Sequence, residues 1–197
     1  MRICGGRAKG IPLKVSKFSQ LRPATEANRE RLFSFLGDLV KKSNVLDLFA
    51  GSGSYGLEAL SRGAAQSKFV EKNRTIVGDL NYNVQKVCKS AGLPSMVAQT
   101  CQRDVLEFLK IKSYSYDLIF LDPPFADHIR LGSIIFQLLH DNDFANYETL
   151  LIFESPAENF STFPNWKMIK TLGKPKKGSP VLQIYELERK SILQGRS

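Results

Sequence analysis

The sequence predicts an α/β fold: a doubly wound, mostly parallel sheet of seven strands with an antiparallel strand at its C-terminal end. Three observations predict it. Apolar runs of strand length alternate with segments whose apolar residues recur at helical spacing. The run at 45–49 passes directly into a glycine-rich turn, AGSGSYG, and then into a helical segment. The runs at 166–172 and 181–188 alternate and are joined by GKPKKGSP, which predicts a closing antiparallel hairpin.

The individual elements follow in chain order. A basic arm over 1–24 holds a short hairpin outside the core, and Thr25 then caps a helix whose last turn contains Lys41 and Lys42. The next expected elements are a strand at 45–49 with a helix from 57, a strand at 67–71, a helix at 74–91 ended by Gly92 and Pro94, a strand at 95–98, a helix at 105–111, a strand at 116–122, a helix at 129–139 and a strand at 149–155. We expect one domain over 25–190 and a tail over 191–197.

The chain carries a net charge of +9, and its cationic side chains gather at the two ends. Residues 1–31 hold eight Lys and Arg against two Glu, and residues 165–197 hold eight against two, so each end carries +6 and the middle −3. Two basic ends around a slightly acidic centre favour a polyanionic partner that the ends hold while chemistry happens between them. The alternative is two solvated, mobile ends.

Composition limits the other classes of protein. Three cysteines without metal-binding spacing indicate reduced thiols in a cytoplasmic protein, and only two histidines make a zinc site unexpected. No apolar run approaches the length that spans a membrane, and the first residues lack the apolar core of a signal peptide. We therefore expect a cytoplasmic protein that binds neither a metal ion nor a membrane. We also expect it to act as a monomer.

The glycine-rich turn predicts a nucleotide-cofactor site. Gly51, Gly53 and Gly56 fit the spacing G-x-G-x-x-G, in which main chain can approach a ligand and the N–H groups of the next helix face it. Asp47 lies in the strand four residues before the first glycine, where a carboxylate would repel a pyrophosphate and attract a cation. S-adenosylmethionine (SAM), which carries an ammonium and a sulfonium, suits that charge. The alternative is a helix N-terminus near a satisfied, buried Asp47.

Two further acids are expected to complete the cofactor site. Glu71 ends the second strand about 20 residues after the glycine turn, where a carboxylate can accept both hydroxyls of a ribose. Asp104 follows the third strand and either marks the adenine site or caps a helix, and the sequence favours neither reading. The residues expected to contact the cofactor are Asp47, Phe49, Ala50, Gly51, Ser52, Gly53, Glu71, Lys72, Asp104 and Val105.

The fourth strand ends in a second chemical signature, Asp122-Pro123-Pro124-Phe125, beside the glycine turn across the point where the strand order reverses. Two consecutive prolines end the strand and fix the loop. The Asp122 carboxylate and the Pro123 carbonyl would accept both N–H bonds of an exocyclic amino group, which helps its delocalised nitrogen to act as a nucleophile. Phe125 would stack on the base. The alternative is a rigid loop in which Asp122 caps a helix.

These motifs resemble those of class I SAM-dependent methyltransferases, D/E-x-x-x-G-x-G, and of amino-methyltransferases, D/N-P-P-F/Y/W. Five stretches within 1–125 are similar to the bacterial 16S rRNA guanine-N2 methyltransferase family (RsmD-type): MRICGGRAKGIPL, LRPATEANRERLFSFL, VLDLFAGSGSYGLEALSRGA, FVEKN and YDLIFLDPPF. The chain departs from that family at ATEANRERLF, where Thr-Thr-Asp-x-x-Arg-Glu-Ala-Leu-Phe is usual, although Thr25 and Arg29 are kept. It also carries the bulky Tyr55 where a small residue is commoner.

The resemblance implies a SAM-dependent enzyme that methylates N2 of one guanine in 16S rRNA, within a small-subunit assembly particle. The arm is expected to stay mobile until RNA orders it. The residues expected to contact the RNA are Arg7, Lys9, Arg22, Thr25 and Arg29.

Three alternatives remain open. A DNA adenine-N6 methyltransferase shares the D-P-P-F logic but usually brings a separate target-recognition domain. A protein glutamine methyltransferase more often carries N-P-P-Y and does not need basic ends. A non-enzymatic RNA-binding module would not need Asp47, Glu71 and Asp122 together.

Overall fold

The structure, a computed structural model, describes residues 1–15, 26–124, 128–157, 162–174 and 179–189. Several expectations lie outside the described residues: the helix cap at Thr25, the contacts of Arg22 and Phe125, and the tail over 191–197. Among the helices that the structure describes, none is long and apolar enough to cross a membrane.

The strands form one seven-stranded sheet in the order β3-β2-β1-β4-β5-β7-β6. Their bounds are β1 Asn44–Leu48, β2 Gln66–Glu71, β3 Ala98–Gln102, β4 Leu118–Leu121, β5 Leu150–Pro156, β6 Trp166–Leu172 and β7 Pro180–Leu187. β1 to β5 pair in parallel, whereas β7 is antiparallel to both β5 and β6. The predicted fold class and the closing hairpin are therefore confirmed. The strand order reverses between β1 and β4, which is where ligands bind in doubly wound sheets.

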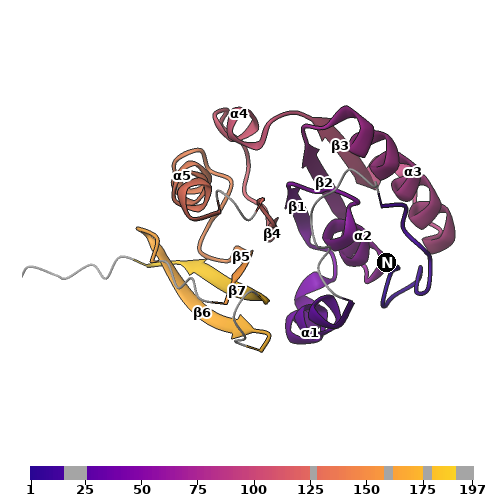
Figure 1. Cartoon of the computed structure of the whole chain (residues 1–197), viewed down its shortest axis with the longest axis horizontal. Coiled ribbons are helices and arrows are strands. Elements are labelled where there is room, and N and C mark those ends of the chain that lie inside the picture. The colour runs from indigo at the N-terminus through magenta and orange to yellow at the C-terminus, as the bar shows by residue number, and fades with distance from the viewer. Residues whose placement is uncertain (16–25, 125–127, 158–161, 175–178, 190–197) are drawn as a thin grey trace, which may run out of the picture.

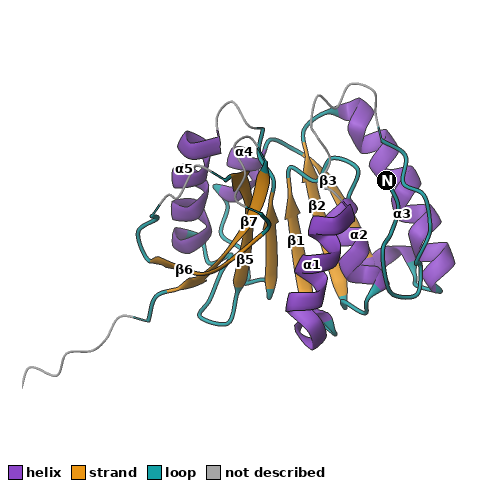
Figure 2. Cartoon of the chain, turned by 60° about the horizontal axis from the view of Figure 1, so that its bottom comes forward, coloured by secondary structure: helices purple, strands orange, loops and turns teal. Residues whose placement is uncertain are grey.

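Helices cover both faces of the sheet. The α-helices are α1 Glu26–Leu36, α2 Ser54–Ser61, α3 Arg74–Ala91, α4 Val105–Leu109 and α5 His128–Asp141, and two 3₁₀ turns are η1 Gly37–Val40 and η2 Ser95–Val97. Figures 1 and 2 show α1, α2 and α3 on one face and α4 and α5 on the other. Each face carries its own cluster of buried apolar side chains, so the sheet is covered on both sides, as its apolar strands require.

The central strands alternate between these two clusters. Phe120 in β4 belongs to the cluster under α1, α2 and α3, and the next residue, Leu121, belongs to the cluster under α4 and α5. Successive side chains of a strand point to opposite faces. Asp47 in β1, Asp122 after β4 and Glu154 in β5 therefore all point toward the face that α1, α2 and α3 cover.

The long helix expected over 74–91 is confirmed as α3. Its first turn is capped by Asn73, whose Oδ1 accepts hydrogen bonds from the N–H groups of Thr75 at 2.9 Å and Ile76 at 3.2 Å. Gly92 ends the helix in the left-handed conformation, with φ of 65°. Cap and terminator are both local, so the sequence alone could locate them.

Two expected elements differ from the structure. The strand expected at 95–98 is wrong, because 95–97 form η2 and β3 begins only at Ala98. β3 lies at the edge of the sheet and is only partly buried, so no apolar run marks it. The helix expected to reach Lys42 stops at Leu36, where Gly37 adopts φ of 50° and the chain continues as η1.

The first fifteen residues form the expected hairpin, closed by an antiparallel bridge, but they pack into the domain. Ile3, Ala8 and Leu13 are 1%, 0% and 6% exposed and join the apolar cluster of α1, α2 and α3. Gly6 has φ of 74°, and a Cβ there would lie 2.0 Å from the carbonyl oxygen of Ser61, so only glycine fits. The expectation of an arm outside the core is therefore wrong for this segment.

A candidate active site at the carboxyl ends of the central strands

The turn between β1 and α2 has an uncommon backbone conformation. Phe49, Gly51 and Gly53 have φ of 57°, 54° and 79°, all left-handed. Glycine adopts this conformation freely, whereas for phenylalanine it costs about 1–2 kcal/mol. Such strain is found mainly where a site needs a particular backbone shape, so the turn is a candidate for ligand binding.

Hydrogen bonds hold this turn to its neighbours. The N–H of Ala50 donates to the carbonyl oxygen of Val70 at 3.1 Å, and the carbonyl oxygen of Ala50 accepts from the N–H of Gly53 at 2.7 Å. The side-chain amide of Asn83 in α3 donates to the carbonyl oxygen of Ser52 at 3.0 Å. The turn is thus fixed by β2 on one side and by α3 on the other.

Glu71 ends β2 and faces the glycine turn. Its Oε2 accepts from the N–H of Gly51 at 3.2 Å, and its Oε1 accepts from the N–H of Asn73 at 2.9 Å. Each carboxylate oxygen can accept a second hydrogen bond, so Glu71 keeps capacity for hydroxyl groups of a ligand. The structure therefore brings Glu71 to the turn, as the sequence predicted.

Asp47 lies below the same turn and is 2% exposed. Its Oδ2 accepts from the N–H of Gly56, in the first turn of α2, at 2.9 Å. Burial raises the pKa of Asp47 to about 8, the bond from Gly56 opposes this rise, and the negative charge of Glu71 adds to it. The bond fits the reading of a satisfied buried acid, and the raised pKa marks a group that a cationic ligand would stabilise in its charged form.

The residues that follow β2 and β3 lie at the carboxyl ends of these two parallel strands, as the glycine turn does at the end of β1. Asp104 caps α4, since its Oδ1 accepts from the N–H of Leu106 at 2.9 Å, so the capping interpretation holds for this side chain. Lys72 lies 3.8 Å from Asp104 in an exposed ion pair. Val105 is 2% exposed and packs in the cluster of α4 and α5, so its side chain serves the core. Contacts of Asp104 and Val105 with a cofactor stay predictions.

Asp122 directly follows β4, next to β1, and is partly buried. Burial raises the pKa of its carboxyl well above the usual value, and the negative charges of Glu154 and Asp47 raise it further. Pro123 is buried and Pro124 is exposed. The loop thus presents Asp122 at the reversal of the strand order, where the sequence placed it.

Sequence reasoning missed Glu154 and noted Tyr55 only as a bulky departure from the family pattern. The hydroxyl of Tyr55 donates to Oε2 of Glu154 at 2.5 Å, and its ring stacks on Phe120 with the ring centroids 5.1 Å apart. The bulky Tyr55 therefore fills the core under α2. In the sequence, Glu154 is simply the acid near the end of an apolar strand. The pattern that could have identified it is an acid at the carboxyl end of the strand that neighbours β4.

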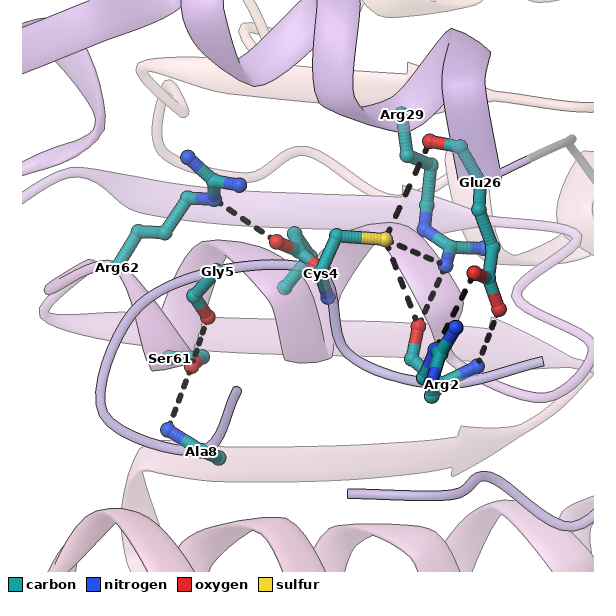
Figure 3. Close-up of polar contacts among 9 residues, drawn as sticks. Arg2, Cys4, Gly5, Ala8, Glu26, Arg29, Ser61 and Arg62 are labelled. Carbon is teal, nitrogen blue, oxygen red and sulfur yellow. Dashed lines mark hydrogen bonds and ion pairs between the residues drawn. The ribbon is translucent and has the colours of Figure 1, made fainter. Parts of the chain in front are cut away.

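The prediction that Arg29 contacts RNA is wrong, because this side chain is 0% exposed. Its Nη2 donates to the carbonyl oxygen of Arg2 at 2.6 Å and to Sγ of Cys4 at 3.2 Å, as Figure 3 shows. The hairpin therefore covers Arg29. The positive charge of Arg29 lowers the pKa values of Tyr55 and Glu154, in opposition to the larger effect of burial.

Arg7 and Lys9 are exposed at the tip of the hairpin. This tip lies beside the C-terminus of α2: the N–H of Arg7 donates to the carbonyl oxygen of Ser61 at 2.8 Å, and Ser61 Oγ bridges Gly5 and Ala8 (Figure 3). α2 starts at the carboxyl ends of the strands and ends at their amino ends. The tip therefore lies near the amino ends of the strands, whereas the glycine turn lies at their carboxyl ends. Contacts of Arg7 and Lys9 with RNA stay predictions.

The strand order, the glycine turn after β1 and the Asp-Pro-Pro loop after β4 together define a Rossmann-like methyltransferase fold of class I. The chain belongs to the family described as Conserved hypothetical protein 95, whose model matches residues 1–186.

Known proteins support this assignment. The chain is 36% identical over 170 residues to Ribosomal RNA small subunit methyltransferase D of Escherichia coli (strain K12), a match that covers 85% of this chain and 82% of that protein. The solved structure of yhhF from Escherichia coli has a TM-score of 0.80 at 32% identity and covers 96% of this chain and 98% of that one. An RNA methyltransferase from Salinibacter ruber in complex with S-adenosyl-L-homocysteine shares the fold, with a TM-score of 0.62 at 14% identity over 84% of this chain and 93% of that one. The family resemblance seen in the sequence is confirmed.

Proposed function

We propose that the chain transfers the methyl group of SAM to N2 of a guanine in 16S rRNA. The observation that carries the proposal is the position of Asp122, which follows β4 beside the glycine turn, in a loop stiffened by Pro123 and Pro124. The relative named Ribosomal RNA small subunit methyltransferase D supports ribosomal RNA as the substrate, because the match covers 85% of this chain.

The residues at the β1 turn fit SAM. Asp47 and Glu71 supply acceptors and, when ionised, negative charge. Among the described residues, a Cβ at Gly51 would meet only the carbonyl oxygen of Phe49 within 4 Å, at 3.8 Å, so main chain is open to a ligand there. When bound, SAM supplies a methyl group on a positively charged sulfur. We propose that Asp47 and the turn hold its methionine part and that Glu71 holds its ribose.

Asp122 would act on the guanine amino group. That nitrogen is a weak nucleophile because its lone pair is delocalised into the ring. Acceptance of its N–H bonds by the Asp122 carboxylate and the Pro123 carbonyl would favour the lone pair that attacks, and Asp122 would take the proton released. Orientation of the reacting groups can contribute about 7–11 kcal/mol. Phe125, which lies outside the described residues, is proposed to stack on the base.

The partner and setting are further parts of the proposal. The +9 net charge supports a polyanionic substrate, and we propose 16S rRNA in a small-subunit assembly particle. The protein would act as a cytoplasmic monomer. The experiment is incubation with tritium-labelled SAM and, in parallel, 16S rRNA, assembled small subunits, duplex DNA and a protein mixture. Label on rRNA or subunits supports the proposal. Label on DNA alone would support an adenine-N6 enzyme, and label on protein alone a glutamine enzyme.

A further inference from the structure

Three carboxyl groups lie in neighbouring strands on the face of the sheet that α1, α2 and α3 cover. Asp47 is in β1, Asp122 directly follows β4, and Glu154 is in β5. The register pairs Leu121 with Phe153, so the next position in each chain places Asp122 beside Glu154. Because side chains alternate along a strand, both carboxyls point to the same face.

Tyr55 fixes the position of Glu154. The hydroxyl of Tyr55 donates to Oε2 of Glu154 at 2.5 Å, and these residues are 4% and 3% exposed. A hydrogen bond so far from water is strengthened by its surroundings. The ring of Tyr55 also stacks on Phe120, two positions before Asp122, with 16° between the ring planes. The side chain of Tyr55 therefore contacts both β4 and β5.

Different neighbouring groups act on the pKa values of Glu154 and Asp122. Burial raises the pKa of Glu154, but the hydrogen bond from Tyr55 and the charge of Arg29 both oppose this rise. Burial also raises the pKa of Asp122, and there the charges of Glu154 and Asp47 add to the rise. Among the described residues, the ionisable groups that act on this pair are therefore Arg29 on α1, Tyr55 on α2 and Asp47 on β1. The negative charge of Glu154 therefore favours the protonated form of Asp122, whereas the Tyr55 hydroxyl and the Arg29 charge favour the ionised form of Glu154.

We propose that Tyr55 and Glu154 are positioning residues for Asp122: Tyr55 holds Glu154 in place as an anion, and the charge of Glu154 makes Asp122 a stronger proton acceptor. The inference rests on the proposed function, because it assigns these residues a part in methyl transfer to an amino group. Neither residue needs to touch the substrate, since both act through Asp122.

The amino nitrogen forms a bond to the methyl carbon with its lone pair, while the carbon–sulfur bond of the donor breaks and its electron pair goes to sulfur. The methylated nitrogen then carries one proton more than the neutral product, and the Asp122 carboxylate takes that proton. A negative charge beside Asp122 raises its proton affinity, which favours this last transfer near neutral pH.

Two conservative variants and one control test the proposal. Glu154→Gln removes the charge but keeps an acceptor for Tyr55, and Tyr55→Phe removes the hydroxyl but keeps the stacked ring. Tyr185→Phe is the control, because Tyr185 is also buried and donates to Gln183 at 2.9 Å, within β7. The measurements are kcat against pH, KM for 16S rRNA, SAM affinity by calorimetry and the melting temperature.

Both site variants should lower kcat about tenfold, a part of what proton transfer usually contributes, and should move the acidic limb of kcat to lower pH. KM and SAM affinity should stay near the wild-type values, and Tyr185→Phe should behave as wild type. A fall in kcat that follows the melting temperature, with the acidic limb in place, would mean that the pair is only structural and would overturn the inference.

A carbon-13 NMR titration of the side-chain carboxyls in the free protein separates the inference from the proposed function. The midpoint of Asp122 should fall in Glu154→Gln, because a neighbouring negative charge is gone. An unmoved midpoint overturns the inference whatever the activity. A moved midpoint together with a wild-type protein that methylates no rRNA leaves the carboxyl pairing standing and overturns the proposed function.

Discussion

At the scale of single residues, the site collects negative charge in a protein whose net charge is +9. Asp47, Glu71, Asp122 and Glu154 all lie at the carboxyl ends of neighbouring strands. Burial and mutual repulsion raise the pKa values of Asp47 and Asp122, so in the free site these carboxyls bind protons more readily than ordinary acids do. A cationic ligand at the glycine turn would relieve this repulsion, which is the electrostatic reason to expect SAM there.

The first prediction concerns Glu71. Glu71→Ala should weaken SAM binding by about 1.5–3 kcal/mol, the usual contribution of a hydrogen bond to a charged group. Glu71 also accepts from Gly51 and Asn73, so thermal unfolding of each variant should be measured beside calorimetric titration. Glu71→Gln is the matched control, because it keeps the size and one acceptor. Unchanged affinity in Glu71→Ala would remove this residue from the site.

The second prediction concerns proton release. The pKa of Asp47 is about 8 in the folded protein, against about 3.9 for an ordinary Asp, so the folded state binds this proton more tightly than the unfolded state. Its contribution to stability is therefore complete below about pH 3.9 and is lost as the pH rises through about 8.

A bound cation should lower the pKa of Asp47, so SAM binding near pH 7 should release protons. The measurement is binding enthalpy in two buffers of different ionisation enthalpy. The enthalpies should differ for the wild type and coincide for Asp47→Asn. Equal wild-type enthalpies would show that Asp47 does not sense the ligand.

At the scale of elements, the N-terminal hairpin is part of the fold. The third prediction compares two left-handed glycines in it. In the part of the chain that the structure describes, a Cβ at Gly10 would meet nothing within 4 Å, whereas one at Gly6 would lie 2.0 Å from the main-chain oxygen of Ser61. Gly10→Ala should cost about 1–2 kcal/mol of unfolding free energy from backbone strain alone, and Gly6→Ala should cost more. Chemical denaturation measures both, and equal losses would mean that the close contact with α2 does not matter.

Local signals explain which elements could be predicted. The buried strands β1 and β4 are apolar runs, and α3 has both a cap and a terminating glycine, so their existence and order follow from the sequence. β3 has no such run. The sequence predicts an arm outside the core because the glycines and cations of residues 1–15 are typical of a flexible segment. Ile3 and Leu13 are nevertheless buried, by a surface that only the folded chain provides.

The residues of the candidate site likewise fall into those that a local sequence pattern predicts and those that it does not. Asp47, Glu71 and Asp122 could be found because each ends or interrupts an apolar run next to a turn. The pairing of Tyr55 with Glu154 joins residues 99 positions apart, and no local pattern marks it. The burial of Arg29 likewise depends on residues that are distant in the chain. The hairpin covers it, and residues 16–25, which lie outside the described residues, separate the hairpin from α1.

At the scale of the whole molecule, the charge distribution predicts how RNA binding depends on salt. If Arg7 and Lys9 contact phosphates, Arg7→Ala/Lys9→Ala should flatten the slope of log affinity against log salt by about 1.4–1.8, because each phosphate contact contributes about 0.7–0.9. Lys110→Ala/Lys112→Ala removes the same charge from exposed positions after α4 and is the control. Equal changes in both variants would mean that only the net charge acts, and that the hairpin tip does not touch RNA.

The central claim is methyl transfer to guanine N2 with Asp122 as the acceptor of its proton. The most direct measurement is nucleoside mass spectrometry of 16S rRNA after incubation with SAM and the wild type, Asp122→Asn or Asp122→Ala, with SAM affinity measured for each. The wild type should produce N2-methylguanosine. Asp122→Asn should retain only a small part of the product, because its amide oxygen still accepts a hydrogen bond but takes up no proton, and Asp122→Ala should produce none while binding SAM nearly as well. A methyl group on another base, or undiminished product from Asp122→Ala, would contradict the account.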